Sequence, residues 1–236
     1  MKNISGFIST KTLILLCISF LLITCKKESE DTPAPVSSNN TVTDIDGNLY
    51  HTVTIGTQVW MVENLKTTRY NDGTQIPLLN TNSAWTSTNS GAYCYYDTVS
   101  ANVDIYGMMY NWFAVNTGKL APAGWRVPTE ADWATLANTL GGDTIAGGKL
   151  KETGTTHWLA PNTGATNSSG YIALPGGFRH NYTGAFQSIG SRGCWWTATE
   201  LNSTDAWYIG LYNNNDDMMK YHDRKEDGFS VRCIKN

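Results

Sequence analysis

Cysteine is the residue type in this sequence with the widest chemical repertoire, because a thiolate can act as a nucleophile, form a disulfide or bind a soft metal. The 236 residues contain five of them: Cys17, Cys25, Cys94, Cys194 and Cys233. A soft-metal site needs convergent thiolates, but Cys194 and Cys233 are 39 residues apart. In an oxidising compartment, the last three cysteines instead predict one disulfide and one free thiol.

The other residues suited to catalysis or metal binding are scattered. The histidines lack the i, i+4 spacing that directs two rings at one metal ion; they are His51, His157, His180 and His222. Asp44 and Asp46 precede Gly47 as in a calcium loop, but the twelfth position holds Ile55 where an EF-hand requires Glu. A second group of acids could bind calcium or form solvated turns, and we favour turns: Asp216, Asp217, Asp223, Glu226 and Asp227. The sequence therefore predicts no metal ion, no cofactor and no catalytic residue.

The N-terminus has the parts of a secretion signal. Lys2 and Lys11 precede the apolar run TLILLCISFLLIT, which ends at Cys25. This run suits a signal peptide, whereas a membrane-spanning helix needs about 20 apolar residues. We therefore expect residues 1–24 to be removed.

The end of this signal, Leu22-Ile23-Thr24-Cys25, resembles the lipobox of bacterial lipoproteins. In that motif the cysteine sulfur receives a diacylglyceryl group and the new N-terminus is acylated. Thr24 replaces the commoner Gly, Ala or Ser, but it is also small. The resemblance implies lipidation of Cys25, and several acyl chains anchor a protein stably in a membrane. A plain secretory signal with an unrelated cysteine is the alternative.

Residues 25–40 are expected to form a tether. The segment KKESEDTPAPVSSNN after Cys25 has one valine and many charges, so it cannot bury enough apolar area to fold. Its lysines followed by Glu28, Glu30 and Asp31 resemble the surface-export signal of Bacteroidetes lipoproteins, which implies an outer-membrane lipoprotein on the cell surface. A solvated linker without an export signal is the alternative.

Residues 41–236 suit one domain. Loss of residues 1–24 removes two lysines and no acid, which takes the net charge from −3 to −5. No basic residues cluster in the sequence, which argues against a nucleic-acid partner. The 9 Trp, 12 Tyr and 22 Gly indicate large rings packed among many turns.

The pattern of apolar and turn residues predicts both helices and strands. Alternation on either side of Asp46-Gly47 predicts a hairpin over residues 42–55. Thr129 as N-cap, Asp132 at N3 and apolar residues at helical spacing predict a helix over 129–140, and a shorter one is expected over 106–115. Later strands are predicted at 195–198, 206–212, 218–222 and 229–234. Helices early and strands late predict an α+β fold with an antiparallel sheet.

Seven strings that lie between Thr41 and Cys233 resemble the Fibrobacter succinogenes major paralogous domain. In chain order they are DIDGNLYHTVTIGTQVWMVENLKTTRYNDGTQIP, GAYCYYD, YGMMYNWFAVNTGKLAPAGWRVPTEADW, GGKLKETGTTHW, ALPGGFR, WWTATE and GFSVRC. The family occurs in secreted and surface proteins of Bacteroidetes and their relatives and has no established activity. The resemblance therefore implies a location more than a reaction.

A more distant likeness links NWFA, RVPTEADW, GGF and the final GFSVRC to the formylglycine-generating enzymes. It implies an α+β, C-type-lectin-like fold, with two helices on a twisted antiparallel sheet and long loops. Those enzymes use two cysteines a few residues apart near the C-terminus, and this chain has no such pair. The Glu-Pro-Asn, Gln-Pro-Asp and Trp-Asn-Asp strings of calcium-dependent lectins are also missing. We therefore expect neither oxidase activity nor calcium-dependent sugar binding.

The family resemblance also implies a disulfide. Cys94 and Cys233 both lie in strings that match the family pattern, so we expect them to pair and Cys194 to stay free. Some relatives have a cysteine where this chain has Ala121, which leaves a pairing of Cys94 with Cys194 open.

Because the sequence argues against catalysis and metal binding, we expect the domain to function in molecular recognition. Aromatic rings in loops can stack on sugars or anchor proteins, and the candidates are Trp85, Trp158, Tyr182, Phe186, Tyr212 and Tyr221. We expect a non-catalytic binding domain for a polysaccharide or for an envelope or host protein, held at the membrane through Cys25. The alternatives are a structural envelope lipoprotein without a specific ligand and a divergent enzyme of formylglycine-generating type.

Overall fold

The computed structural model describes residues 40–236. The predicted signal peptide (1–24), the lipidation site Cys25 and all but the last residue of the tether (25–40) lie outside the described residues and stay predictions. Within the described part of the chain, no helix has the length and apolar character needed to cross a bilayer.

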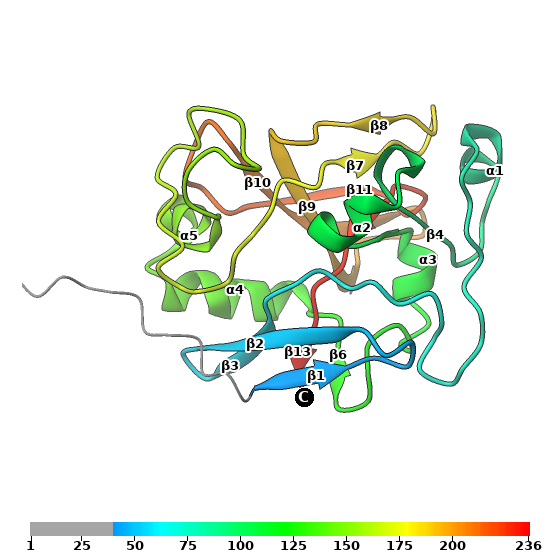
Figure 1. Cartoon of the computed structure of the whole chain (residues 1–236), viewed down its shortest axis with the longest axis horizontal. Coiled ribbons are helices and arrows are strands. Elements are labelled where there is room, and N and C mark those ends of the chain that lie inside the picture. The colour runs from blue at the N-terminus through cyan, green and yellow to red at the C-terminus, as the bar shows by residue number, and fades with distance from the viewer. Residues whose placement is uncertain (1–39) are drawn as a thin grey trace, which may run out of the picture. The chain divides into compact units, whose positions relative to one another are not determined.

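Most of the regular structure is β-strand. The strands are β1 (Thr41–Thr43), β2 (Leu49–Ile55), β3 (Gln58–Met61), β4 (Tyr93–Cys94), β5 (Met109–Tyr110), β6 (Trp125–Arg126), β7 (Phe178–Arg179), β8 (Phe186–Gln187), β9 (Arg192–Glu200), β10 (Asp205–Tyr212), β11 (Met219–Arg224), β12 (Phe229–Ser230) and β13 (Ile234–Lys235). They form a five-stranded sheet in the order β1-β2-β3-β13-β6, a six-stranded sheet in the order β11-β10-β9-β12-β5-β4, and the hairpin β7-β8 (Figure 1).

The helices are short. They are α1 (Asn82–Thr86), α2 (Ala101–Tyr106), α3 (Trp112–Val115), α4 (Glu130–Thr139) and α5 (Asp143–Leu150), with a 3-10 turn over Tyr96–Thr98. The longest of them, α4, has 10 residues.

The predicted N-terminal hairpin is confirmed. Strands β1 and β2 pair antiparallel, with Thr41 opposite His51. The Asp44 carboxylate accepts hydrogen bonds from the backbone N–H groups of Asp46 and Asn48, both at 2.9 Å, and Gly47 adopts φ +87°. Asp44 therefore closes a turn, as the sequence indicated.

The predicted late strands are confirmed in β9, β10 and β11, where β10 pairs antiparallel with both neighbours. The strand predicted over 229–234 is two strands instead. Phe229 pairs with Tyr110 in the six-stranded sheet, whereas Ile234 pairs with Trp60 in the five-stranded sheet. The C-terminal segment thus joins the two larger sheets.

Helix α4 is confirmed with its predicted cap. Thr129 and Asp132 form a capping box, in which each side chain accepts a hydrogen bond from the backbone N–H of the other residue. The Arg126 guanidinium donates to both Asp132 oxygens, at 2.5 and 2.8 Å, and fixes the start of the helix. The apolar face buries Trp133 and Leu136.

The helix predicted over 106–115 is wrong. Gly107 adopts φ +74° and ends α2, and Met109 and Tyr110 form β5. Only Trp112–Val115 is helical, and the Asn111 side chain caps this single turn by accepting from the Ala114 backbone N–H. Tyr110 packs in the main core and its neighbour Met109 packs in a separate small cluster, which is the alternation of a strand and not the single apolar face of a helix.

The expected fold class is also wrong. We expected an α+β, C-type-lectin-like arrangement of two helices on one twisted antiparallel sheet, but the described residues form several sheets, one of them a curled half-barrel, with few helices. The capping box of α4 predicted that one helix correctly, but it carried no information about a second helix beside it. The remaining chain is too rich in turns and rings to form a second long helix.

The predicted disulfide is not present. Cys94, Cys194 and Cys233 are all free and buried. Cys94 packs in a small cluster with Trp85 and Met109, whereas Cys233 belongs to the main core. Burial raises the pKa of the thiols of Cys94 and Cys194 to about 12, so neither is a reactive thiolate at neutral pH.

Buried cations connect the loops to the sheets. Arg179 is 0 % exposed, lies 4.7 Å from the rings of both Trp85 and Phe186, and donates to the carbonyl oxygens of Leu79 (2.5 Å) and Gly184 (2.9 Å). A guanidinium offers five donors in a planar fork, so one side chain can fix several loop carbonyls at once.

Arg232 performs the same task in the second large cluster. Its Nη1 donates to the Tyr171 carbonyl at 2.6 Å, its Nε donates to Asn64 Oδ1 at 3.0 Å, and its Cζ lies 4.2 Å from the Tyr171 ring. Asn64 Oδ1 also accepts from Trp195 Nε1 at 2.8 Å. One arginine thus joins a loop, a strand and the segment that links the two larger sheets.

Lys151 is the third of these cations and is also 0 % exposed. Its amine donates to the carbonyl oxygens of Thr163 (2.8 Å), Tyr212 (2.9 Å) and Asn215 (2.7 Å), and lies 5.4 Å from the Trp158 ring. Burial lowers the pKa of Lys151 to about 8, so the amine is charged at pH 7. It therefore ties the end of β10, Asn215 in the turn that follows it and the loop at Thr163 together.

Replacing Lys151 with Met should lower the free energy of unfolding by about 3 kcal/mol or more, because three buried carbonyls lose a charged donor. Denaturant unfolding at pH 7 measures this. Lys220→Met is the matched control, since Lys220 ends in a solvent-exposed ion pair with Glu130, and such pairs contribute about 0–1 kcal/mol. Equal unfolding midpoints for Lys151→Met and the wild type would show that the amine does not hold these loops.

Candidate functional site

The structure separates the six predicted aromatic residues. Trp85 and Trp158 are 0 % exposed and pack on the buried cations Arg179 and Lys151. Phe186 is half-buried and covers the other face of the Arg179 guanidinium. Trp85 and Trp158 therefore serve the core and cannot present a ring to a ligand.

The other three candidates lie at the surface. Tyr182 is 86 % exposed in the turn of the β7-β8 hairpin, and Tyr212 and Tyr221 lie on β10 and β11. The rings of Tyr212 and Tyr221 are 6.3 Å apart in an edge-to-face arrangement. Only these two of the six are brought into mutual contact at the surface.

Tyr212 and Tyr221 belong to a group of side chains that we call the tyrosine–arginine face. Because side chains alternate along a strand, residues two apart on β9, β10 and β11 share one side of the sheet, and a ring from β7 packs beside them. The members are Phe178, Arg192, Tyr208, Tyr212, Tyr221 and Asp223. Strand β10 lies between β9 and β11, and β7 contacts β9 (Figure 1).

Arg192 is the centre of this face. Its Cζ lies 5.0 Å from the Tyr212 ring, 5.1 Å from the Phe178 ring and 5.4 Å from the Tyr208 ring. Its Nη2 donates to the Tyr208 hydroxyl. Among residues 40–236 it forms no ion pair with a carboxylate, its Nε is buried without a hydrogen-bond partner, and its Nη1 donates to no other side chain or carbonyl. The guanidinium thus keeps donors that the domain itself does not use.

An acid pair borders the face. Asp227 is 1 % exposed, and its Oδ1 accepts from the Asn181 backbone N–H at 2.6 Å. Burial, followed by the neighbouring Asp223 carboxylate with which it shares a hydrogen bond, raises the pKa of Asp227 to about 9. Asp227 is therefore protonated at neutral pH. Asp223 lies on the same face as Arg192 but beyond ion-pair distance from it.

The histidines and acids of residues 40–236 form no metal-binding cluster. Within the described part of the chain, no three His, Cys, Asp or Glu side chains lie close enough together to hold a metal ion. His51 pairs with Glu63 at 2.7 Å, and His157 pairs with Glu152 at 2.9 Å. These are two-residue contacts in separate parts of the domain.

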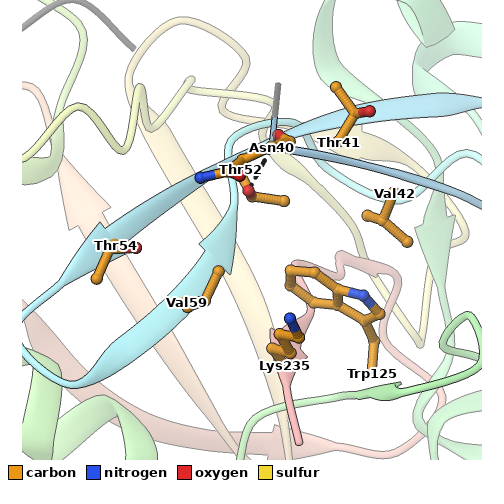
Figure 2. A pocket seen from close by; sticks show the side chains of 8 residues that line it. All are labelled: Asn40, Thr41, Val42, Thr52, Thr54, Val59, Trp125 and Lys235. Carbon is orange, nitrogen blue, oxygen red and sulfur yellow. Dashed lines mark hydrogen bonds between the residues drawn. The ribbon is translucent and has the colours of Figure 1, made fainter. Parts of the chain in front are cut away.

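A pocket of about 250 Å³ lies on the other large sheet. Each of the five strands of the curled sheet contributes to it, and we call it the strand-lined pocket (Figure 2). Its lining residues are Asn40, Thr41, Val42, Thr52, Thr54, Val59, Trp125 and Lys235. Figure 2 shows the Trp125 indole beside Lys235, and these two residues are direct partners in the ladder between β6 and β13.

A comparison with known protein families shows to which family this chain belongs. A model of the Fibrobacter succinogenes major domain matches residues 53–235. The chain belongs to this family. Neither a curated protein nor a solved structure matches the chain.

The sequence did not point to every residue at these two surfaces of the Fibrobacter succinogenes major domain. Tyr212 and Tyr221 were found because a turn-prone segment follows the first of them. Arg192, Trp125 and Lys235 were missed. The register of β9 places Arg192 under the tyrosines, and long-range strand pairing places Trp125 beside Lys235. Neither contact leaves a local signal in the sequence.

The Asp227 carboxyl should make the stability of the domain depend on pH. Its pKa rises from the ordinary value of 3.8 to about 9 on folding, so between these values the folded chain holds a proton that the unfolded chain has lost. This contribution to stability is complete below about pH 4 and is lost as the pH rises through 9. Asp227→Asn keeps the acceptor for Asn181 and should remove that loss. Thermal unfolding from pH 5 to 9 measures both profiles.

The exposed Asp104 supplies the control. Asp104→Asn should reproduce the wild-type pH profile. If Asp227→Asn also reproduces it, Asp227 is not the proton-holding group.

Proposed function

We propose that this protein is a surface-anchored lipoprotein whose Fibrobacter succinogenes major domain binds glycans without catalysis, through the tyrosine–arginine face. The secretion signal and the lipobox-like string before Cys25 support the anchor, and the export-like residues behind it support the outer face of the outer membrane. The proposed partners are a polysaccharide, bound by the domain, and the membrane, into which the lipid on Cys25 inserts.

One observation carries the binding function: two accessible rings, Tyr212 and Tyr221, adjoin an arginine with unused donors. Tyr221 is 37 % exposed and its ring lies 5.7 Å from that of Tyr208. The apolar face of a sugar ring stacks on aromatic rings, while sugar hydroxyls accept hydrogen bonds from nearby polar groups. Tyr212 and Tyr221 supply the rings, and Arg192 supplies the donors.

The charges on this face favour a neutral ligand. Arg192 carries one positive charge, Asp223 carries one negative charge, and Asp227 is neutral because its pKa is about 9. A strongly cationic ligand would be repelled by Arg192, and a strongly anionic ligand would be repelled by Asp223. The hydroxyls of a neutral saccharide can accept hydrogen bonds from Arg192 and donate hydrogen bonds to Asp223.

Two features support binding over catalysis. The Asp227 carboxyl is 1 % exposed, and the thiols of Cys94, Cys194 and Cys233 are all buried. A catalytic acid or nucleophile must reach the reacting atoms, and these groups lie beneath the surface.

A glycan array probed with the full chain tests the proposal. The wild type should bind at least one neutral plant, host or bacterial polysaccharide. Tyr221→Ala and Tyr212→Ala should each weaken that binding about tenfold or more, which is about 1.4 kcal/mol of lost stacking.

Trp207→Ala is the control for this array, because Trp207 lies on the opposite side of β10 from Tyr208 and Tyr212 and is also partly exposed. It should bind as the wild type does. Absence of any hit, or equal binding by the tyrosine variants, would refute glycan recognition at this face.

The anchor has its own test. Cells that express the wild-type chain should incorporate labelled palmitate into it, and Cys25→Ala should abolish the label because the thioether can no longer form. Labelling of both chains to the same extent would contradict the lipoprotein assignment. Cys17→Ala, which changes a cysteine inside the expected signal peptide, should label normally.

A further inference from the structure

We propose that the strand-lined pocket is a second binding site, one that takes a single unit of an acidic saccharide. The pocket belongs to the five-stranded sheet, whereas the tyrosine–arginine face belongs to the six-stranded sheet. The two sites therefore share no residue, and each proposal stands without the other.

The lining of the pocket supplies three kinds of contact. Trp125 is partly buried, so its indole is held in place while part of it faces the hollow (Figure 2). Thr41, Thr52 and Thr54 bring hydroxyl groups, and Asn40 brings an amide. Small-molecule sites commonly combine an aromatic ring with a few hydrogen-bond donors and acceptors. A sugar can stack on the ring and form hydrogen bonds with the polar groups.

Lys235 gives the site its charge preference. It is the only charged residue that lines the pocket, it is exposed, and among residues 40–236 it forms no ion pair. Its ladder partner Trp125 fixes it next to the indole. A carboxylate on a stacked sugar ring would complete a charge-assisted hydrogen bond to the ammonium.

The size and the backbone favour a saccharide over a peptide. A volume of about 250 Å³ lies below the range of about 300–1,000 Å³ for drug-sized ligands, which suits one ring of a longer chain. The inner strands β2, β3 and β13 are each paired on both sides. An extended peptide could therefore form ladder hydrogen bonds only with the short edge strands β1 and β6, which have 3 and 2 residues.

Calorimetric titration of the full chain tests this inference, with hexamers of galacturonate, glucuronate and mannuronate as the acidic probes. At least one should bind, and its methyl ester should bind at least tenfold more weakly because the carboxylate is neutralised. Lys235→Met should also weaken binding at least tenfold, Lys235→Arg should restore most of it, and Trp125→Ala should remove it.

The matched control is a second tryptophan and lysine pair on the six-stranded sheet, where the Lys220 amine lies 4.8 Å from the Trp207 ring. Lys220→Met and Trp207→Ala should bind as the wild type does, and so should Tyr221→Ala, which separates this site from the tyrosine–arginine face. Lys235 is exposed, so Lys235→Met tests the site even if Trp125→Ala fails to fold.

Four results would overturn the inference. No acidic hexamer binds, or the methyl ester binds equally, or Lys235→Met has wild-type affinity. Equal binding of hexaglutamate would also overturn it, because the pocket would then recognise any acidic chain and not a saccharide.

Discussion

The structure depends on the pairing of buried cations with loop carbonyls. In the described residues, Arg179, Arg232 and Lys151 are at most 1 % exposed, and each donates to backbone oxygens of segments far away in the sequence. A buried charge without partners costs several kcal/mol. These cations are satisfied by carbonyls and by aromatic faces, so the domain keeps long loops ordered although its helices and most strands are short.

This constraint extends to the tyrosine–arginine face. The Lys151 amine holds the carbonyl of Tyr212, and its neighbour Trp158 covers the same amine. Tyr212 is thereby fixed at the end of β10, next to Arg192. Arg192 differs from the buried cations because it is only partly buried and its Nη1 has no hydrogen-bond partner among the described residues. The domain thus uses one chemical device twice: cations with filled donor sets hold the loops, and a cation with spare donors faces outward.

Local signals in the sequence were predictive, and long-range ones were absent. The Asp46-Gly47 hairpin and the Thr129 cap each depend on a few adjacent residues, and both were confirmed. Trp85 and Trp158 were expected at the surface because their cation partners cannot be read from nearby residues. The family pattern suggested a bridge between Cys94 and Cys233, but the fold places these thiols in separate clusters. The α+β prediction was wrong because one well-capped helix was taken as evidence for a layer of two helices packed on a sheet.

The central claim is that the spare donors of Arg192 receive a glycan. The most direct measurement is an NMR titration of the arginine Nε–H signals of the ¹⁵N-labelled chain with the oligosaccharide that binds best on the array. The Arg192 signal, assigned through Arg192→Lys, should shift with the same affinity as the array binding, while those of Arg179 and Arg232 should stay unchanged because their donors are filled. Saturated binding with an unshifted Arg192 signal would contradict the account.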